Sequence, residues 1–383
     1  MSERVILVVT VLILLTAGGQ TARAQETEEL FEPEVHRAVV LEVGELKANG
    51  ASYFGEGSGT QKVRVRITAG ELAGEELLLD HNLTGNPAYD LSVTQGDRVL
   101  VGITEDGDFS DTYIMDFIRD RSLAYMTLLF FAALVLVGGL RGAKIILVLG
   151  LTGLAVYYVL IPMVLAGRSP IGGAVLVGAG VTALTMIFLV GFSGKALSAG
   201  AGTVAGVVTA GLLAWFFGNQ SNLMGLHSQE AQMLLFSTDV PIDFRGILFA
   251  GMILGALGAI MDVSVSIAST VEEVHAANPA LTFWSLTRSG LNVGRDVLGT
   301  MANTLILAYT GGALPLLLLL VANRIESVKI LNLDLIATEV IRALSGTIGL
   351  VVCIPLTALL AAAVKKGLPR ASLRTEAETL TDD

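Results

Sequence analysis

The pattern of apolar and polar positions changes near residue 120. Before that point apolar and polar residues alternate in short stretches, as they do at residues 62–67 and 113–118. A period of two predicts strands with one buried face, and glycine-rich turns at 55–59 and 95–97 separate them. About five short strands between residues 35 and 118 predict a small β-barrel of the OB or SH3-like kind.

After residue 120 the apolar positions form long uninterrupted runs. A helix needs roughly 20 apolar residues to cross the hydrocarbon core of a bilayer, and each run approaches that length. The pattern therefore predicts a polytopic α-helical membrane bundle of about seven spans, at 122–140, 143–165, 171–191, 196–218, 246–268, 301–322 and 344–364.

The first 24 residues have the composition of a secretory signal. Arg4 precedes an apolar stretch, and Ala22-Arg23-Ala24 forms a small-x-small cleavage site. An uncleaved anchor is the alternative, and either places the following domain outside. We therefore predict a signal peptide at 1–24, an acidic extracytoplasmic β-domain at 25–120, a transmembrane helical domain at 121–366 and a cytoplasmic polar tail at 367–383.

The location follows from the same pattern. Lys and Arg are more frequent in the connections that this topology places inside the cell, including the C-terminal tail. The predicted location is a bacterial cell membrane, crossed several times, with the N-terminal domain outside and the C-terminus in the cytoplasm.

Composition supports a lipid environment. Hydrophobic residues make up 53% of the chain and charged residues 15%, with a mean hydropathy of +0.69. Soluble domains carry about 25% charged residues, so the lipid bilayer is the expected partner of most of this surface.

Negative charge is concentrated in the predicted outer domain. Residues 25–122 hold 20 Asp and Glu against 8 Lys and Arg, whereas the net charge of the whole chain is −11. Such a surface repels nucleic acid, which we exclude as a partner. The domain is better suited to a structural role or to docking a protein partner than to binding an oligonucleotide.

A group of polar residues interrupts the fifth predicted span. Asp262 lies well inside it, and a carboxylate at that depth costs several kcal/mol unless it is paired, protonated or in contact with water. Ser266, Ser269 and Glu273 follow Asp262 at helical spacing and so share its face.

A second polar stripe follows the predicted helix break at Asn278-Pro279. Its members recur at helical spacing and are Arg288, Asn292, Arg295, Gly299 and Asn303, with Asp296 adjacent to Arg295. Stripes on consecutive helices can meet, with Arg295 or Arg288 as the partner of Asp262. The functional interpretation is a polar pathway for a small solute or ion, and the structural one is a buried network that fixes helix packing.

Glycine and proline predict a discontinuity in the sixth span. Gly311, Gly312 and Pro315 fall near its middle, where glycine adds backbone freedom and proline removes a helical hydrogen bond. Transporters often bind substrate where a spanning helix is interrupted.

Other features carry less chemistry. Gly-x-x-x-Gly sequences at 202–206 and 251–255 allow a homo-oligomer without requiring one. His227, Glu230, Asp239 and Asp243 could ligate a cation, but their spacing is more typical of a solvated loop. The lone Cys353 is expected to be a core residue. No catalytic motif, metal centre or cofactor is predicted, and the chain is not expected to be an enzyme.

The polar stretch also resembles a known family. GALGAIMDVSVSIAS at 255–269, SGLNVGRDVLGTMANT at 289–304 and EVIRALSG at 339–346 are similar to the most recognisable segments of YibE/F membrane proteins. The Val263–Val265 stretch is a conservative difference. The resemblance covers nearly the whole chain and implies an outer β-domain followed by a helical bundle, but it assigns no site residue.

Together these patterns predict a transporter or permease for an unidentified small solute or ion, with its polar site around Asp262 and Arg295. The alternative is a membrane scaffold that transports nothing and whose outer β-domain docks an envelope partner.

Overall fold

The computed structural model describes residues 34–48, 58–86, 88–106, 109–238 and 240–366. The predicted signal peptide, the predicted cytoplasmic tail, most of the glycine-rich turn at 55–59, and Asp239 lie outside the described residues. The chain divides near residue 133 into a β-unit and a helical unit, which we describe separately.

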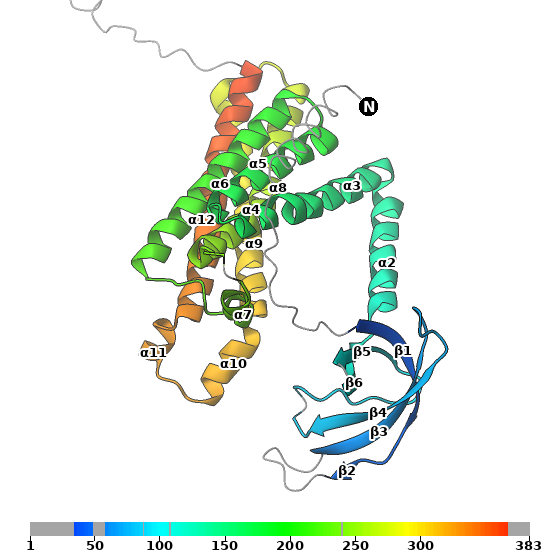
Figure 1. Cartoon of the computed structure of the whole chain (residues 1–383). Coiled ribbons are helices and arrows are strands. Elements are labelled where there is room, and N and C mark those ends of the chain that lie inside the picture. Colours follow the sequence, from blue (N-terminus) through cyan, green and yellow to red (C-terminus); the bar gives the residue numbers. More distant parts are fainter. Residues whose placement is uncertain (1–33, 49–57, 87, 107–108, 239, 367–383) are drawn as a thin grey trace, which may run out of the picture. The chain divides into compact units, whose positions relative to one another are not determined.

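The β-unit is a curled antiparallel sheet in the order β2-β3-β1-β5-β6, with β4 paired to β3 (Figure 1). Its described strands are β1 (Glu34–Val43), β2 (Lys47–Ala48), β3 (Ser58–Ile67), β4 (Glu76–Thr84), β5 (Arg98–Asp106) and β6 (Phe109–Phe117). β4 also approaches β6, but no ladder joins them, so the sheet forms a half-barrel. A small β-domain before a helical bundle is therefore confirmed.

Strand β3 shows why this sequence folds into a sheet with one buried face. Val63, Val65 and Ile67 are almost completely buried and pack in the core of the unit. The basic residues between them face solvent, where Arg64 and Arg66 contact Glu42 and Glu76 on neighbouring strands. Burial of each apolar side chain contributes about 1.5–3 kcal/mol, whereas such exposed ion pairs contribute at most about 1 kcal/mol. The apolar alternation thus sets the register.

The helical unit and the helix that leads into it contain eleven described α-helices. They are α2 (Asp120–Gly138), α3 (Leu140–Ala155), α4 (Ile161–Leu165), α5 (Pro170–Thr185), α6 (Gly194–Gln220), α7 (Gln229–Ser237), α8 (Phe244–Ala277), α9 (Phe283–Gly312), α10 (Leu314–Ala322) and α11 (Ser327–Leu331) before the long α12. Helix α12 covers Asp334–Lys366, and π-helical turns at Val156–Leu160 and Met186–Val190 extend α3 and α5.

Long apolar helices make this a membrane protein of several spans. Among the described residues six helices are long and apolar enough to cross a bilayer, and α9 with α10 makes a seventh if the bent pair is one span. The predicted helical membrane bundle is confirmed.

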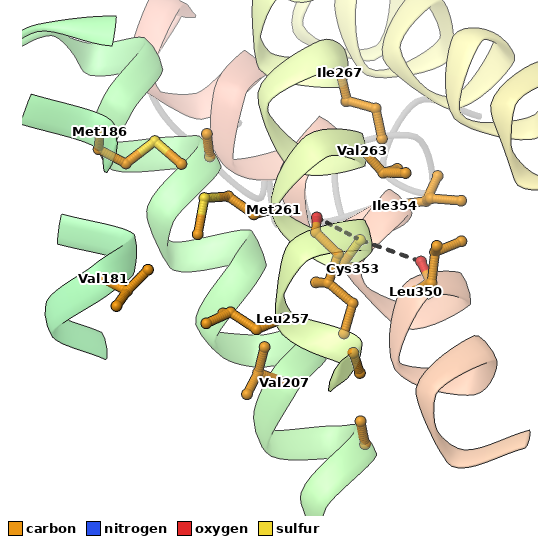
Figure 2. Close-up of a cluster of buried hydrophobic side chains, with 14 of the residues drawn as sticks. Val181, Met186, Val207, Leu257, Met261, Val263, Ile267, Leu350, Cys353 and Ile354 are labelled. Atoms are coloured by element: carbon orange, nitrogen blue, oxygen red, sulfur yellow. Dashed lines mark hydrogen bonds between the residues drawn. The ribbon is translucent and has the colours of Figure 1, made fainter. Parts of the chain in front are cut away.

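Helices α6, α8 and α12 form the centre of the bundle (Figure 1). A Cβ atom added to Gly206 of α6 would lie 2.7 Å from Ile260 Cγ2 and 2.8 Å from Cys353 Cβ, so only glycine permits this approach. The Cys353 thiol is fully buried and donates to Leu350 O at 3.2 Å (Figure 2). Cys353 is therefore a core residue, as expected. Close packing of small residues replaces hydrophobic collapse as the main force between helices in lipid.

Helix α9 differs from the sequence prediction at its beginning. The sixth span was predicted at 301–322, but α9 already begins at Phe283 and packs against α8 and α12 from there. Polar residues lower the hydropathy of its first half, which hides a helix whose buried positions include Leu286, Gly290 and Gly294.

The predicted discontinuity coincides with a bend of 61° between α9 and α10. Helix α9 ends at Gly312, and Pro315 lies in the first turn of α10, where proline is tolerated because no helical hydrogen bond is lost. By contrast, α12 continues through Pro355 without a break.

Candidate functional site

Helix α8 positions Asp262. The helix begins at Phe244, where the Asp243 side chain accepts a hydrogen bond from Gly246 N at 2.8 Å, and it continues for 34 residues. At about 1.5 Å per residue it is longer than the bilayer core is thick, so Glu273 lies beyond the apolar part of the helix. Between the two ends of the helix, its exposed residues recur at helical spacing and are Gly251, Gly255, Gly258, Asp262, Ser266 and Glu273.

Helix α9 positions the second predicted stripe. The Thr282 side chain caps its N-terminus by accepting from Ser285 N at 3.2 Å. All five predicted polar members are exposed, namely Arg288, Asn292, Arg295, Asp296 and Asn303. Arg295 Nη1 donates to Asn292 Oδ1 on its own helix at 3.4 Å.

The two helices run antiparallel in a register set by glycine. A Cβ at Gly290 would lie 2.9 Å from Val271 Cγ2, and one at Gly294 would lie 3.2 Å from Ile267 Cδ1. It follows that Arg295 is level with Ser266, and that Asp262 is level with the turn of α9 around Gly299. The Tyr309 hydroxyl lies 3.3 Å from a Cβ built on Gly255, so the exposed stripe of α8 borders α9.

The structure does not form the expected ion pair between Asp262 and Arg295 or Arg288. The contact between α8 and α9 uses glycine and branched aliphatic side chains, which leaves the polar side chains on the outer flanks of both helices. In addition, Arg295 sits about one helical turn from the level of Asp262. All of the predicted polar residues except Ser269 are therefore exposed on these two neighbouring helices, and no ion pair of the described chain joins the two stripes.

We call this surface the α8–α9 face. It comprises the exposed α8 residues Gly251, Gly255, Gly258, Asp262 and Ser266 and the exposed α9 residues Asn292, Arg295, Asp296, Gly299 and Asn303. Ser269 is only partly exposed at its edge and donates to Val265 O at 2.7 Å, which satisfies its hydroxyl within the helix.

Sequence reasoning missed an ionic cluster that joins three helices. Glu272 of α8 lies 2.7 Å from Lys365 Nζ of α12 and 4.0 Å from Lys195 Nζ of α6. Its three side chains are 23–33% exposed. Glu272 follows Ala268 by four residues and so continues the buried face of α8. The prediction followed the polar stripe on the other face and therefore did not include Glu272.

A small buried polar contact also lies between α8 and α12. Thr357 Oγ1 donates to Ser264 Oγ at 3.4 Å, and both residues are fully buried. Ser264 belongs to the segment that resembles the family, but it points away from the α8–α9 face.

The loop between α6 and α8 offers no assembled cation site within the described residues. No group of three or more His, Cys, Asp and Glu that could hold a metal occurs there or elsewhere in the described chain. Asp243 is engaged as the helix cap of α8. Nearby, a cavity of about 350 Å³ is lined in part by Ser221, Asn222, Asn332 and Asp334, none of which was predicted.

Chemically, the α8–α9 face combines two acids, an arginine and two amides on membrane-spanning helices. Such groups can replace the hydration shell of a polar solute or ion as it crosses the bilayer. Binding or passage of a polar ligand is therefore the chemistry that the arrangement supports.

Two family models match the chain. Residues 126–367 match the model described as YibE/F-like protein, and residues 36–117 match the YibE/F family N-terminal domain. No curated protein and no solved structure matches the chain. The helical match includes every residue of the α8–α9 face.

Proposed function

The chain belongs to the YibE/F family, and we propose that it is a permease that moves a small polar solute or ion along the α8–α9 face. One observation carries the proposal: charged and amide side chains are exposed on helices that cross the membrane. Asp262 lies 18 residues after the start of α8, at bilayer depth, and no cation of the described chain pairs with it.

Free energy limits what this face can contact. A charged side chain in contact with hydrocarbon costs about 2.5–3.5 kcal/mol or more, so several of them cannot face lipid tails together. The exposed residues of α6 are of the opposite kind, with Val204, Val208 and Leu212 about half exposed. The α6 surface is suited to lipid, whereas the α8–α9 face requires water or protein.

Each part of the face has a proposed role. Asp262 supplies the negative charge that coordinates a cation or couples a proton, and Arg295 attracts the counter-charge one turn away. The bend between Gly312 and Pro315 is the flexible element, because α10 can change its angle to α9 without breaking helical hydrogen bonds. No covalent step is part of this mechanism.

The proposed topology places the N-terminal β-domain outside the cell and the C-terminus inside it. Under this arrangement the Glu272 cluster and the connection at 278–282 lie at the cytoplasmic end of the bundle. Solute would then leave the α8–α9 face beside Arg288 and Glu273, which are both exposed.

Substituted cysteines provide the direct test. In a Cys353→Ala background, single variants Ser266→Cys and Asn303→Cys are treated with a membrane-impermeant methanethiosulfonate in proteoliposomes. A water-lined pathway predicts fast modification, because a thiol reacts as its thiolate and ionises only in water. Leu212→Cys on α6 is the matched control, since it is equally uncovered but expected to face lipid.

Flux measurements complete the test. Proteoliposomes are screened with radiolabelled metal cations, protons and small metabolites, comparing the natural chain with Asp262→Asn and with Glu326→Gln as a charge control in an exposed loop. We expect flux that is lost only in Asp262→Asn. Unreactive cysteines on the α8–α9 face, together with an Asp262→Asn chain that fails to fold, would favour the scaffold with a docking β-domain.

A further inference from the structure

Within the described residues, almost nothing packs close to the glycines of the α8–α9 face. Nothing lies within 4 Å of a Cβ built on Gly251, Gly258 or Gly299, and Gly255 has only the Tyr309 hydroxyl near it. On the opposite side of α8, by contrast, Ile260 and Ile267 are completely buried. The described residues therefore line only one side of the proposed membrane pathway.

The chemistry of the face narrows what can complete it. Lipid is unsuitable because the face carries Asp262, Asp296 and Arg295. Helix α2 is the least buried spanning helix of the described chain, but beyond its first turn it has no charged residue and only Tyr125 and Thr127 as polar side chains. Helix α2 therefore lacks the groups that could satisfy these charges.

The face is complementary to itself. The face carries both signs of charge: Asp262 and Asp296 are acidic, Arg295 is basic, and the neighbouring Glu273 and Arg288 add one of each sign. In a two-fold arrangement each contact occurs twice with the partners exchanged, so an acid of one copy can meet an arginine of the other. A face with one sign of charge would instead repel its own copy.

Charged and small residues are also separated along the helix axis. Gly251, Gly255 and Gly258 occupy one part of the α8 stripe, and the polar residues Asp262, Ser266 and Glu273 occupy the rest. A glycine stripe lets two helices approach closely, and that close packing is a main source of helix association in lipid. The glycine part of the stripe can therefore pack directly against another helix, whereas the polar part can line a water-filled cavity.

From these features we infer that a second copy of this chain packs against the α8–α9 face and forms the opposite wall of the pathway. The two α8 helices contact each other at Gly251, Gly255 and Gly258, which brings both copies of Asp262 to one shared polar cavity. This inference rests on the proposed function, because it is the pathway that the second copy completes.

The first test is crosslinking in the membrane. In the Cys353→Ala background, Ser266→Cys is treated with a short bis-maleimide before solubilisation, and dimers are scored on denaturing gels. We expect most of the Ser266→Cys chain to be crosslinked, and the Leu212→Cys control on α6 to stay at least fivefold lower. Equal crosslinking at both positions would show random collision and overturn the inference.

A glycine variant tests the contact without relying on a reactive group. Gly258→Leu fits within one chain, since nothing lies within 4 Å of its Cβ, but its side chain blocks the approach of a second α8. We expect the natural chain to be a dimer by native mass spectrometry in lipid nanodiscs and Gly258→Leu to be mainly monomeric. Gly150→Leu on α3, where nothing lies within 4 Å either, should remain dimeric.

The outcomes separate this inference from the proposed function. A natural chain that is monomeric at every protein-to-lipid ratio, or a Gly258→Leu chain as dimeric as the natural one, overturns the inference. A stoichiometric complex with a different protein and no self-association does so as well. A monomer with flux that depends on Asp262 would contradict the dimer but agree with the permease function. A crosslinked dimer with unreactive cysteines and no flux would contradict the permease function but agree with the dimer.

Discussion

The two faces of helix α8 differ in packing and in exposure. On the buried face, residues such as Ala256, Ile260 and Ser264 are completely enclosed, and the glycines of α6 and α12 that contact them admit no added atom without a shift. On the exposed face, Asp262 and Ser266 are open to the surroundings, and Asp262 is in no ion pair of the described chain. The buried face specifies the fold of one chain, and the exposed face is available for ligand or partner.

This difference matters because both faces carry polar residues. Ser264 and Thr357 satisfy each other inside the bundle, so they need no partner from outside. Asp262 lies only two residues away but has no cation of the described residues within ion-pair distance. Burial and pairing in the folded chain, more than polarity itself, distinguish a structural residue from a candidate functional one.

The largest expected effect tests the two faces with one type of substitution. Gly206→Leu forces a side chain into Ile260, Cys353 and Gly349 O, which a Cβ alone would approach to 2.7–2.9 Å. We expect a loss of about 3 kcal/mol or more in unfolding free energy, or no folded protein. Gly258→Leu should change the stability of the detergent-solubilised chain by less than about 0.5 kcal/mol. Thermal unfolding followed by circular dichroism measures both, and equal losses would contradict the distinction.

A second prediction concerns the ionic cluster at the end of the buried face. Glu272→Gln leaves Lys365 and Lys195 without their acid, and we expect a loss of about 1–2 kcal/mol. The value is reduced from that of a fully buried pair because water reaches a third of the glutamate side chain. Glu273→Gln is the matched control, since Glu273 is exposed and in no ion pair of the described chain. Similar melting temperatures for the two variants would contradict the prediction that Glu272 stabilises the fold.

A third prediction sharpens the interpretation of Asp262. Because the side chain is uncovered and unpaired within the chain, Asp262→Asn should alter the unfolding free energy in detergent by less than about 0.5 kcal/mol. A structural network would instead lose about 3–5 kcal/mol, since it would strand a buried arginine. Thermal unfolding of the purified variant at matched detergent concentration decides between these values.

The smallest effect is expected in the β-unit, where the charged side chains are in contact with water and interact with nearby residues only. Desolvation raises the pKa of Asp90, but hydrogen bonds from Thr84 and Gly85 outweigh it, so the pKa lies below its ordinary value. A lowered pKa stabilises the fold above the unfolded value near 3.8, and this contribution is lost as the pH falls through the folded pKa.

Hydrogen–deuterium exchange of the peptide at 76–90 in the full chain tests this. Exchange, corrected for its intrinsic pH dependence, should accelerate as the pH is lowered below 3.8 in the natural chain. In Asp90→Asn the end of β4 should be less protected already at neutral pH, with no further acceleration in acid. The same acid response in both chains would exclude Asp90 as its cause.

Much of the architecture could be predicted from residue patterns alone. Alternation at 62–67 predicted a strand because one-sided burial requires a period of two, and β3 has that burial. Long apolar runs predicted the spanning helices because lipid leaves no other way to satisfy the backbone. Helical spacing from Arg288 to Asn303 predicted a helix there, but the predicted span began only at residue 301, because the polar first half of α9 has a low hydropathy.

The site residues show what one sequence can and cannot determine. Helical spacing placed Asp262 with Ser266, and Arg295 with Asn292, on common faces, because the helix fixes those angles locally. It could not determine that glycines at 290 and 294 would form the contact between α8 and α9, nor that Glu272 would join Lys195 and Lys365. Periodicity is set by the covalent chain, whereas the partner of each face depends on packing between residues far apart in sequence, and only the tertiary structure decided that.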